Sequence, residues 1–357
     1  MFAGTQTLAP ATSQGIYAFS WDPKLGALNP LGLAAKTPNP TFIALSPDKK
    51  TLIAANEIDS FTDPTVPPGM KTGAVSSFKV SGHNLSFVNS VAAQGSGTCH
   101  VAIDQSGLSV FAANYNGGSA ASFRLGADGA LSNAVSQFHY QGHGPNPDRQ
   151  EAPHAHRVTV SPENRFVFVN DLGLDCLHIY HLGWASATLT PAEPPLWPST
   201  PGSGPRALRF HPIAPFVYCV NELASTIDVL GWKAATGGLT QVQKLDLLEP
   251  GNKAVARASE LVFDRTGNFG YAAVRDTNFL ATLAVNPTTG KLTLLDRTDC
   301  GGKTPRHIAL DPTEQWLLVA NQDSDNITAI PRDSRTGKLA PNGINTALSK
   351  PQCLLFV

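Results

Sequence analysis

The chain has 357 residues, of which 31 are Gly and 28 are Pro, together roughly 17% against a usual value of about 12%. Only 15% are charged, where about 25% is common, which indicates many turns and little exposed helix. Lys and Arg number 26 against 27 Asp and Glu, and this net charge of −1 lacks the basic field on which binding to nucleic acid or anionic membranes depends. We therefore expect no nucleic-acid partner.

The longest apolar runs, such as residues 316–320, are far shorter than the 18 or more residues of a membrane helix, so we expect no membrane insertion. No basic segment followed by an apolar one opens the chain, although Met1 does not settle whether a leader was removed. The five cysteines are odd in number and lack C-x-x-C spacing, which predicts small buried residues rather than disulfides or a zinc site. A reducing, cytoplasmic location fits best.

A repeat runs along the chain. Residues 1–5, 15–19 and 26–28 read as short strands, and six copies of one pattern follow them. Its clearest copy consists of residues 305–312, 316–322, 326–330 and 336–339. The second strand of each copy ends at a phase marker, and the markers are Asn56, Asn114, Asn170, Asn221, Arg275 and Asn321. Four strands per unit at a period near 50 residues are typical of a propeller blade.

The two ends complete the count of blades. Residues 351–356 match a first strand with nothing after them, whereas residues 1–5 match a second strand. We therefore predict an all-β fold, a seven-bladed β-propeller of four antiparallel strands per blade, with the last blade closed by both termini and one domain over residues 1–357. Closure removes open sheet edges, so trimming the last seven residues should cost far more than their number suggests. The termini disfavour the alternative of two β-sandwiches.

Charged residues gather at one mouth of this predicted channel. The first strand of a blade starts at the face to which the antiparallel second strand returns, so residues that open the first and close the second share that face. These positions include His100, His156, Arg206, Glu222, Glu260, Arg275 and Arg306. Arginine forks suit carboxylate or phosphate oxygens, and a Glu or His beside them can relay a proton. The alternative is that Arg206 and Glu222 form only a structural ion pair.

The longest insertions, residues 58–73, 141–153 and 188–204, are expected on the same face, which indicates a binding face. His154 and His156 lie close in sequence, yet no third ligand is apparent, so we expect no metal. Residues 202–204 are not followed by the Lys-Ser/Thr and helix of a phosphate loop, and no Gly-x-Ser-x-Gly elbow occurs. We expect no cofactor.

Several motifs together resemble one family. They are residues 154–156 leading into a strand, residues 170–173, residues 204–206 with 220–223, and residues 305–307 with 320–326. They are similar to the seven-bladed lactonase family, which contains bacterial propeller-type 6-phosphogluconolactonases and fungal 3-carboxy-cis,cis-muconate cyclases. The resemblance covers nearly the whole chain.

The resemblance implies a catalytic cluster of one His, two Arg and one Glu. The matching residues are His156 (or His154), Arg206, Glu222 and Arg275, and the 16-residue separation of Arg206 and Glu222 is that of the cyclases. Arg275 is placed by phase rather than by motif, because it stands where other copies have Asn. The candidate substrate-binding residues are His100, His154, Glu260, Arg306, His307 and Gln322.

A lactonase must activate water, polarise the ring carbonyl and stabilise the oxyanion. We expect His156 or Glu222 as the general base, with His156 favoured because two arginines should depress the pKa of Glu222. Arg206 would stabilise the oxyanion, and Arg275 and Arg306 would hold an anionic group. The expected function is a monomeric, 6-phosphogluconolactonase-like hydrolase of the pentose phosphate pathway that opens an anionic sugar lactone. The alternatives are a carboxymuconate cyclase and a non-catalytic interaction scaffold.

Overall fold

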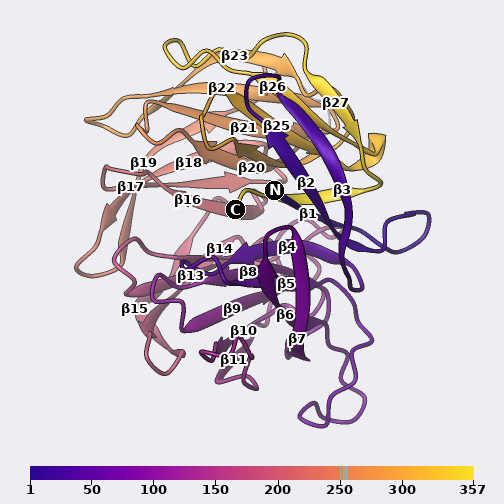
Figure 1. Cartoon of the computed structure of the whole chain (residues 1–357). Coiled ribbons are helices and arrows are strands. Elements are labelled where there is room, and N and C mark those ends of the chain that lie inside the picture. The colour runs from indigo at the N-terminus through magenta and orange to yellow at the C-terminus, as the bar shows by residue number, and fades with distance from the viewer. Residues whose placement is uncertain (250, 252–255) are drawn as a thin grey trace.

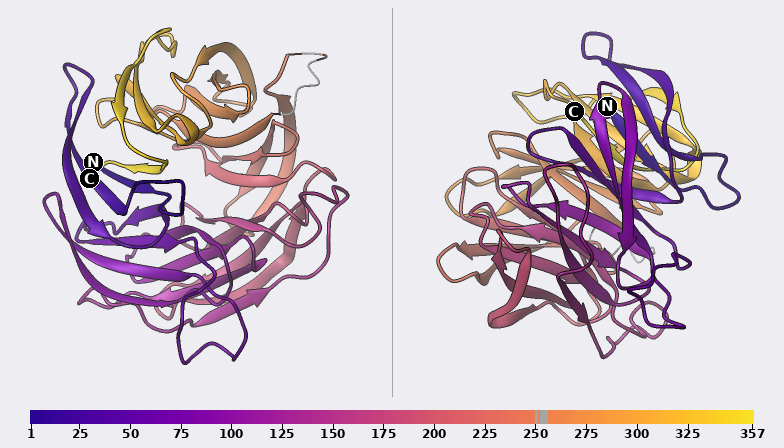
Figure 2. Two further views of the ribbon diagram at one scale, coloured as in Figure 1. Left: turned by 90° about the vertical axis from the view of Figure 1, so that its right-hand side faces the viewer. Right: turned by 60° about the horizontal axis from the view of Figure 1, so that its bottom comes forward.

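The computed structural model describes residues 1–249, 251 and 256–357. These residues form seven four-stranded antiparallel sheets that stand around one axis as the blades of a propeller (Figures 1 and 2). The described residues also contain one 3-10 turn, η1 (Gln322–Ser324), between β25 and β26, and they contain no α-helix. The predicted fold class is therefore confirmed. No helix in this part of the chain has the length and apolar character needed to cross a bilayer.

Within each blade the strands follow one another from the axis outward. Blade 1 has β28 (Pro351–Leu355), β1 (Phe2–Thr5), β2 (Gly15–Asp22) and β3 (Ala27–Lys36). Blade 2 has β4 (Pro40–Leu45), β5 (Thr51–Asn56), β6 (Ala74–Ser81) and β7 (Asn84–Ala92). Blade 3 has β8 (Thr98–Ile103), β9 (Ser109–Asn114), β10 (Ser119–Arg124) and β11 (Ser136–His139). Blade 4 has β12 (Ala155–Val160), β13 (Phe166–Asp171), β14 (Cys176–Gly183) and β15 (Thr188–Pro198).

Blade 5 has β16 (Pro205–Phe210), β17 (Phe216–Asn221), β18 (Thr226–Lys233) and β19 (Gly238–Asp246). Blade 6 has β20 (Arg257–Phe263), β21 (Phe269–Arg275), β22 (Phe279–Val285) and β23 (Leu292–Asp299). Blade 7 has β24 (Pro305–Leu310), β25 (Trp316–Asn321), β26 (Asn326–Pro331) and β27 (Ile344–Ala347).

The termini close the ring as predicted. Phe2 and Gly4 of β1 pair with Leu355 and Cys353 of β28, and both chain ends lie side by side in each view (Figures 1 and 2). The seven inner strands contact one another in an unbroken ring, β28, β4, β8, β12, β16, β20 and β24. One predicted insertion was wrong in part, because Thr188–Pro198 of the expected loop 188–204 is the outer strand β15. This run pairs with β14 and so forms the fourth strand of its blade.

Local sequence explains the repeating turns. In blades whose first two strands are consecutive, a polar residue after the inner strand holds the tight turn, as Asp104 Oδ1 does by accepting from the amides of Leu108 and Ser109 at 2.9 and 2.8 Å. Ser161 Oγ accepts from the Phe166 amide in the same way at 3.1 Å. The cores lie between neighbouring blades, where apolar faces of adjacent sheets pack together.

The phase-marker asparagines are buried, and their side-chain amides form hydrogen bonds. Asn114 Nδ2 donates to Ala93 O at 2.9 Å and Asn321 Nδ2 donates to Cys300 O at 3.1 Å, which ties the second strands of blades 3 and 7 to the segments leading into those blades. In blade 6 the marker is Arg275, whose Nε donates to Arg257 O at 3.4 Å while the rest of its guanidinium reaches the channel. The longer side chain turns a structural position into one that carries charge.

Candidate active site

Every inner strand carries a β-bulge at its start. In blade 4, Ala155 pairs with Asp171 and Arg157 with Asn170, so His156 is the extra residue. The same irregularity occurs in all seven blades at Gln352, Thr41, Cys99, His156, Arg206, the Ser259/Glu260 pair and Arg306. A bulge re-aims side chains, and consecutive residues of the same strand, such as His156 and Arg157, therefore both line the channel. The channel mouth is thus built from two rings of side chains.

Glu222, next to the end of β17, is the centre of the upper cluster. Its Oε2 lies 3.0 Å from Arg206 Nε and 2.5 Å from Arg275 Nη2, and its Oε1 accepts from Arg149 Nη2 at 2.7 Å. Only 2% of Glu222 is exposed. Burial alone would raise the pKa of this carboxyl, but the charges of Arg275 and Arg206 outweigh burial and hold the pKa well below its ordinary value. The depressed pKa predicted for Glu222 is confirmed.

Arg206 is held from two sides. Besides the contact with Glu222, its Nη1 donates to the carbonyl of Ser259 in the next blade. Burial, together with the neighbouring charge of Arg275, lowers the pKa of Arg206 to about 9. Its Nη2 has no hydrogen-bond partner among the described residues. Its Nε, although 3.0 Å from Glu222 Oε2, also makes no hydrogen bond with the described residues. Arg206 is therefore a fixed cation whose Nη2 is available to a ligand.

His156 lines the same opening and is half-buried. Burial, and the charge of Arg206 after it, lower the pKa of His156 well below 6.5, so the ring is neutral at pH 7. Tyr115 stands edge-on to the ring at 5.6 Å between centroids. Neither ring nitrogen has a protein hydrogen-bond partner in the described part of the chain, which leaves both free to exchange a proton with a ligand or water.

A second cluster lies deeper in the channel around Glu260. Its carboxylate pairs with Arg157 Nη1 at 2.8 Å and Arg209 Nη2 at 3.1 Å, and His307 Nε2 lies 3.8 Å away. Burial would raise the pKa of Glu260, yet the two arginines hold it well below the ordinary value. Burial lowers the pKa of His307 to about 4. His100 lies beside this cluster with its ring 4.0 Å from that of Phe42.

The structure separates the predicted site residues into groups. His156, Arg206, Glu222, Arg275 and Arg306 lie at or near the mouth, and His100, Glu260 and His307 lie below them. His154 and Gln322 lie outside this channel lining. His154 is stacked on Tyr115 at 4.3 Å and its Nε2 lies 3.2 Å from Glu151. Gln322 Nε2 donates to Asp323 at the rim.

Sequence reasoning missed two residues of the upper cluster as site candidates. Arg149 and Tyr115 touch each other, with Arg149 Nη2 donating to Tyr115 Oη at 3.2 Å as well as to Glu222. The available signal was the position of Arg149 in the insertion 141–153, which was expected on this face. Arg157 was expected among the residues that open the first strands but was not chosen as a site candidate, and Arg209 was missed; both pair with Glu260.

The channel holds far more positive than negative charge. Around the two glutamates, Glu222 and Glu260, stand six arginines, which are Arg149, Arg157, Arg206, Arg209, Arg275 and Arg306. Their formal sum is +4 in a chain whose net charge is −1. Since the lining histidines His100, His156 and His307 have lowered pKa values, they add no charge at pH 7. Such a site favours an anionic ligand.

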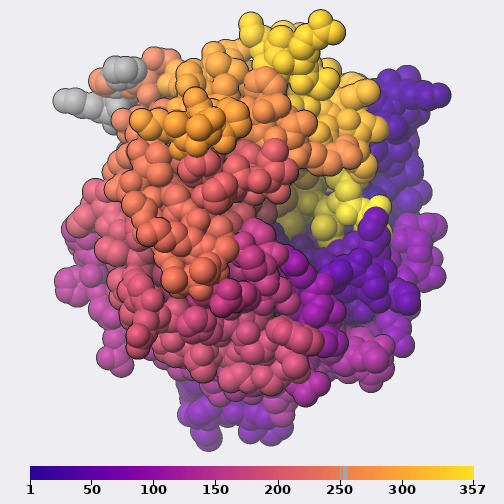
Figure 3. Space-filling view, turned by 90° about the vertical axis from the view of Figure 1, so that its left-hand side faces the viewer, coloured from indigo at the N-terminus to yellow at the C-terminus, as the bar shows by residue number. Residues whose placement is uncertain are grey.

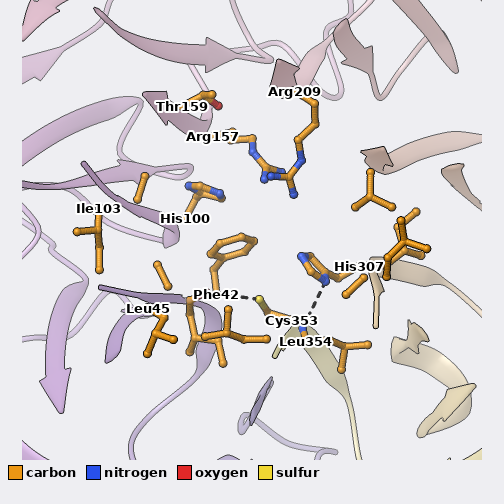
Figure 4. Close-up of a pocket in the computed structure, with 18 of the residues that line it drawn as sticks. Phe42, Leu45, His100, Ile103, Arg157, Thr159, Arg209, His307, Cys353 and Leu354 are labelled. Atoms are coloured by element: carbon orange, nitrogen blue, oxygen red, sulfur yellow. Dashed lines mark hydrogen bonds between the residues drawn. The ribbon is translucent and has the colours of Figure 1, made fainter. Parts of the chain in front are cut away.

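The opposite end of the channel is wide and largely apolar. There the inner strands surround a cavity of ≈ 930 Å³ whose walls are largely apolar, with Leu45, Ile103 and Leu354 among them. Figure 3 shows the hollow on this face, and Figure 4 shows Arg157 and Arg209 side by side at its inner end. The six described arginines and both glutamates thus lie between the mouth and this inner end. Among the described residues, no three His, Cys, Asp or Glu side chains gather as a metal site requires.

A closed seven-bladed propeller with a neutral histidine and fixed arginines in its channel mouth has the construction of a propeller enzyme. The family described as "Lactonase, 7-bladed beta-propeller" matches residues 1–356. The 6-phosphogluconolactonase of Bacillus subtilis is 30% identical over 358 residues, covering 100% of this chain and 97% of that protein. The 6-phosphogluconolactonase of Formosa agariphila is 29% identical over 345 residues, covering 95% and 94%.

A solved structure also shows the similarity to lactonases. The periplasmic gluconolactonase of Pseudomonas aeruginosa superimposes with a TM-score of 0.90 at 30% identity, covering 98% of this chain and 96% of that one. The chain belongs to the seven-bladed β-propeller lactonase family. It is a lactone hydrolase, as the sequence predicted.

Proposed function

We propose that this lactone hydrolase opens an anionic sugar lactone, with 6-phosphoglucono-δ-lactone as the substrate. The observation that carries the proposal is the excess of arginine, six against two glutamates, around one channel. An uncharged lactone would leave that excess unbalanced in the complex, whereas a phosphate offers oxygen acceptors to the arginine forks. The names of the relatives from Bacillus subtilis and Formosa agariphila agree with this substrate.

In this proposal each site residue has one role in lactone hydrolysis. Neutral His156 accepts a proton from water as the water oxygen attacks the ring carbonyl carbon. Arg206 donates its available Nη2–H to the developing oxyanion. The C–O bond of the ring then breaks as the tetrahedral carbon re-forms its carbonyl, and the ring oxygen leaves as a hydroxyl by taking up the proton that His156 received from water. Glu222, held ionised, is a poor base and instead fixes Arg206 and Arg275 in place.

Arg306 is the proposed contact for the phosphate. It opens β24, is half-buried at the channel lining, and forms no ion pair with the described residues. Arg206, Arg275 and Arg149 each have a carboxylate partner already, in Glu222. Arg306 can therefore bind a ligand oxyanion without giving up a protein partner, and Arg275 would assist it.

The test is ring opening of 6-phosphoglucono-δ-lactone and of glucono-δ-lactone, each corrected for spontaneous hydrolysis. We expect the parent to prefer the phosphorylated lactone and Arg306→Gln to lose roughly 10- to 100-fold in kcat/KM on that lactone alone, as expected for one charge-assisted hydrogen bond of about 1.5–3 kcal/mol. Arg265→Gln, an exposed arginine paired with Glu314 next to the opposite cavity, is the matched control. Equal rates on both lactones would instead favour an unphosphorylated sugar lactone as the substrate.

We also propose that the enzyme is a cytoplasmic monomer of the pentose phosphate pathway. The lack of C-x-x-C spacing and the free, buried state of all five cysteines agree with a reducing compartment. Because the relative from Pseudomonas aeruginosa is described as periplasmic, subcellular fractionation is the direct test. Sedimentation at several protein concentrations tests the monomer.

A further inference from the structure

Between the mouth and the opposite cavity the channel narrows to a neck. The neck encloses a cavity of ≈ 20 Å³ lined by side chains of both rings. This volume is sufficient for one water-sized or monatomic ligand and too small for a phosphate. The neck shares His156, Arg206 and Arg306 with the mouth, and it shares Phe42, His100, Arg157 and His307 with the wide cavity on the opposite face. It therefore connects the two, and its own volume is too small for a lactone.

Four buried polar atoms of the neck lining have no hydrogen-bond partner among the described residues. One of them, Arg206 Nε, lies 3.0 Å from Glu222 Oε2, and the other three have no such ion-pair contact. These three are Thr41 Oγ1 on β4, His100 Nε2 on β8 and Gln352 Nε2 on β28. The three residues are 6%, 5% and 4% exposed. Buried polar atoms are nearly always paired, and three such atoms around one small cavity point to a ligand common to all of them.

All three atoms can donate. His100 Nδ1 accepts from the Val158 amide at 3.4 Å, so the neutral ring carries its hydrogen on Nε2. The pKa of His100, lowered mainly by burial, agrees with a neutral ring. The side-chain amide nitrogen of Gln352 is a donor, and the hydroxyl of Thr41 can turn to donate. An anion can accept from all three atoms, whereas a water would accept from His100 and Gln352 and donate to the Thr41 hydroxyl. The charge around the neck decides between the two.

The charge around the neck favours an anion. Arg157, Arg206 and Arg306 line it together with a single carboxylate, Glu260, so the formal charge of the lining is +2. The carboxylate of Glu260 is already engaged by Arg157 and Arg209. Burial among like charges lowers the pKa of Arg206, which is the response expected where positive charge is in excess.

We propose that the neck binds one monatomic anion of halide size, chloride in the cell, held by Thr41, His100 and Gln352. No covalent step is involved, and the proposal does not depend on which lactone the mouth accepts. The anion would satisfy three orphaned donors and offset part of the arginine charge beneath the active site. This makes it a structural and electrostatic component of the channel.

Bromide is the probe, because it replaces chloride and scatters anomalously. Crystals of the full-length protein grown or soaked in bromide should show an anomalous peak in the neck, within hydrogen-bond distance of Thr41 Oγ1, His100 Nε2 and Gln352 Nε2. Density for a water without anomalous signal would overturn the proposal. This measurement uses the parent protein, so it does not depend on any variant folding.

Thermal unfolding gives an independent measurement. When bromide replaces methanesulfonate at constant ionic strength, the melting temperature of the parent should rise, because a ligand that binds only the folded state stabilises it. Thr41→Val and Gln352→Met should lose most of that rise. Thr282→Val is the matched control, since Thr282 Oγ1 is also buried without a partner among the described residues but lies on β22, away from the neck. An equal rise in Thr41→Val and Thr282→Val would contradict the proposal.

Discussion

Arg149 and Glu222 are 73 residues apart in the sequence and meet at 2.7 Å in the channel mouth. The arginine comes from the insertion between β11 and β12, and its side chain remains 31% exposed, whereas that of Glu222 is 3% exposed. An insertion loop thus reaches over the mouth and holds one oxygen of the carboxylate whose other oxygen orients Arg206 and Arg275. The loop is a part of the site rather than decoration.

Removing this contact should impair catalysis. In Arg149→Met, Glu222 keeps Arg206 and Arg275 but loses the hydrogen bond to Oε1, so the carboxylate can turn and misplace both arginines. We expect kcat/KM to fall roughly 10- to 100-fold, the equivalent of one charge-assisted hydrogen bond of about 1.5–3 kcal/mol. Steady-state lactone hydrolysis measures this change. Arg265→Met, which breaks the exposed pair with Glu314, should stay within about threefold of the parent.

The pH dependence of the rate should follow His156. Its pKa lies well below 6.5 in the folded protein, so the ring remains an unprotonated base at pH 7 and through 6.5. We expect kcat/KM, corrected for spontaneous hydrolysis, to stay level as pH falls through 6.5 and to decline only at more acidic pH. His156→Asn should remove this acid limb together with most of the activity. A decline with its midpoint at or above 6.5 would show that another group is the base.

Acid should destabilise the fold in two stages. His100, His156 and His307 have folded pKa values below 6.5, and Glu222 and Glu260 have values below 4.5, so at acidic pH the unfolded chain binds more protons. Stability is therefore fully present above pH 6.5. It falls from there toward pH 4 as the histidines titrate, and it falls further below 4.5 as the glutamates do. Urea unfolding at a series of pH values measures the decline.

His307 allows a quantitative test of the first stage. A pKa moved from 6.5 to about 4 corresponds to about 3 kcal/mol of unfolding free energy lost between those pH values. His307→Asn, whose amide oxygen can take the place of Nδ1 in accepting from the Leu354 amide, should show a shallower decline over this range. The exposed His83, replaced by Asn, is the control. Identical slopes in both variants would mean that His307 does not titrate as described.

Sequence alone was enough to predict the blade architecture, because its signals are local. Turn residues such as Asp104 and Ser161 hold the turns by their own side chains, and buried asparagines such as Asn114 tie a blade to the segment before it. The closure of the ring by the two termini was also predictable, because residues 351–355 and 2–5 match the first and second strands of one blade and pair in one sheet. The prediction of a loop at 188–204 was wrong in part, because β15 contains four prolines at exposed positions of an outer strand. A run so rich in proline resembles a loop.

The site was only partly predictable, because its geometry depends on contacts between distant segments. The bulges at the start of every inner strand bring consecutive residues into the channel, which strict strand alternation does not predict. Arg149 reaches Glu222 from another blade connection, and no spacing rule links two residues 73 apart. His154 illustrates the reverse case, because a motif position close to His156 instead stacks on Tyr115.

The C-terminal strand offers the sharpest test of the closed ring. Deleting residues 351–357 removes β28, the inner strand of blade 1, and with it the buried Cys353 and Leu354 and the pairing with β1. Lost apolar burial and exposed strand edges should together cost on the order of 5 kcal/mol. A chain shortened by Val357 alone, which is 43% exposed, should unfold like the parent.

Circular dichroism and thermal unfolding measure the cost of the deletion, and a synthetic peptide of residues 351–357 provides the decisive control. If β28 closes the ring, the peptide added in excess should reverse much of the fall in melting temperature. The peptide can pair with β1 and occupy the place between β4 and β24. A peptide with Leu354 replaced by Asp should fail to do so, since Leu354 is 2% exposed and packs against blade 7. Unchanged stability after the deletion would mean that six blades hold the ring without closure by the termini.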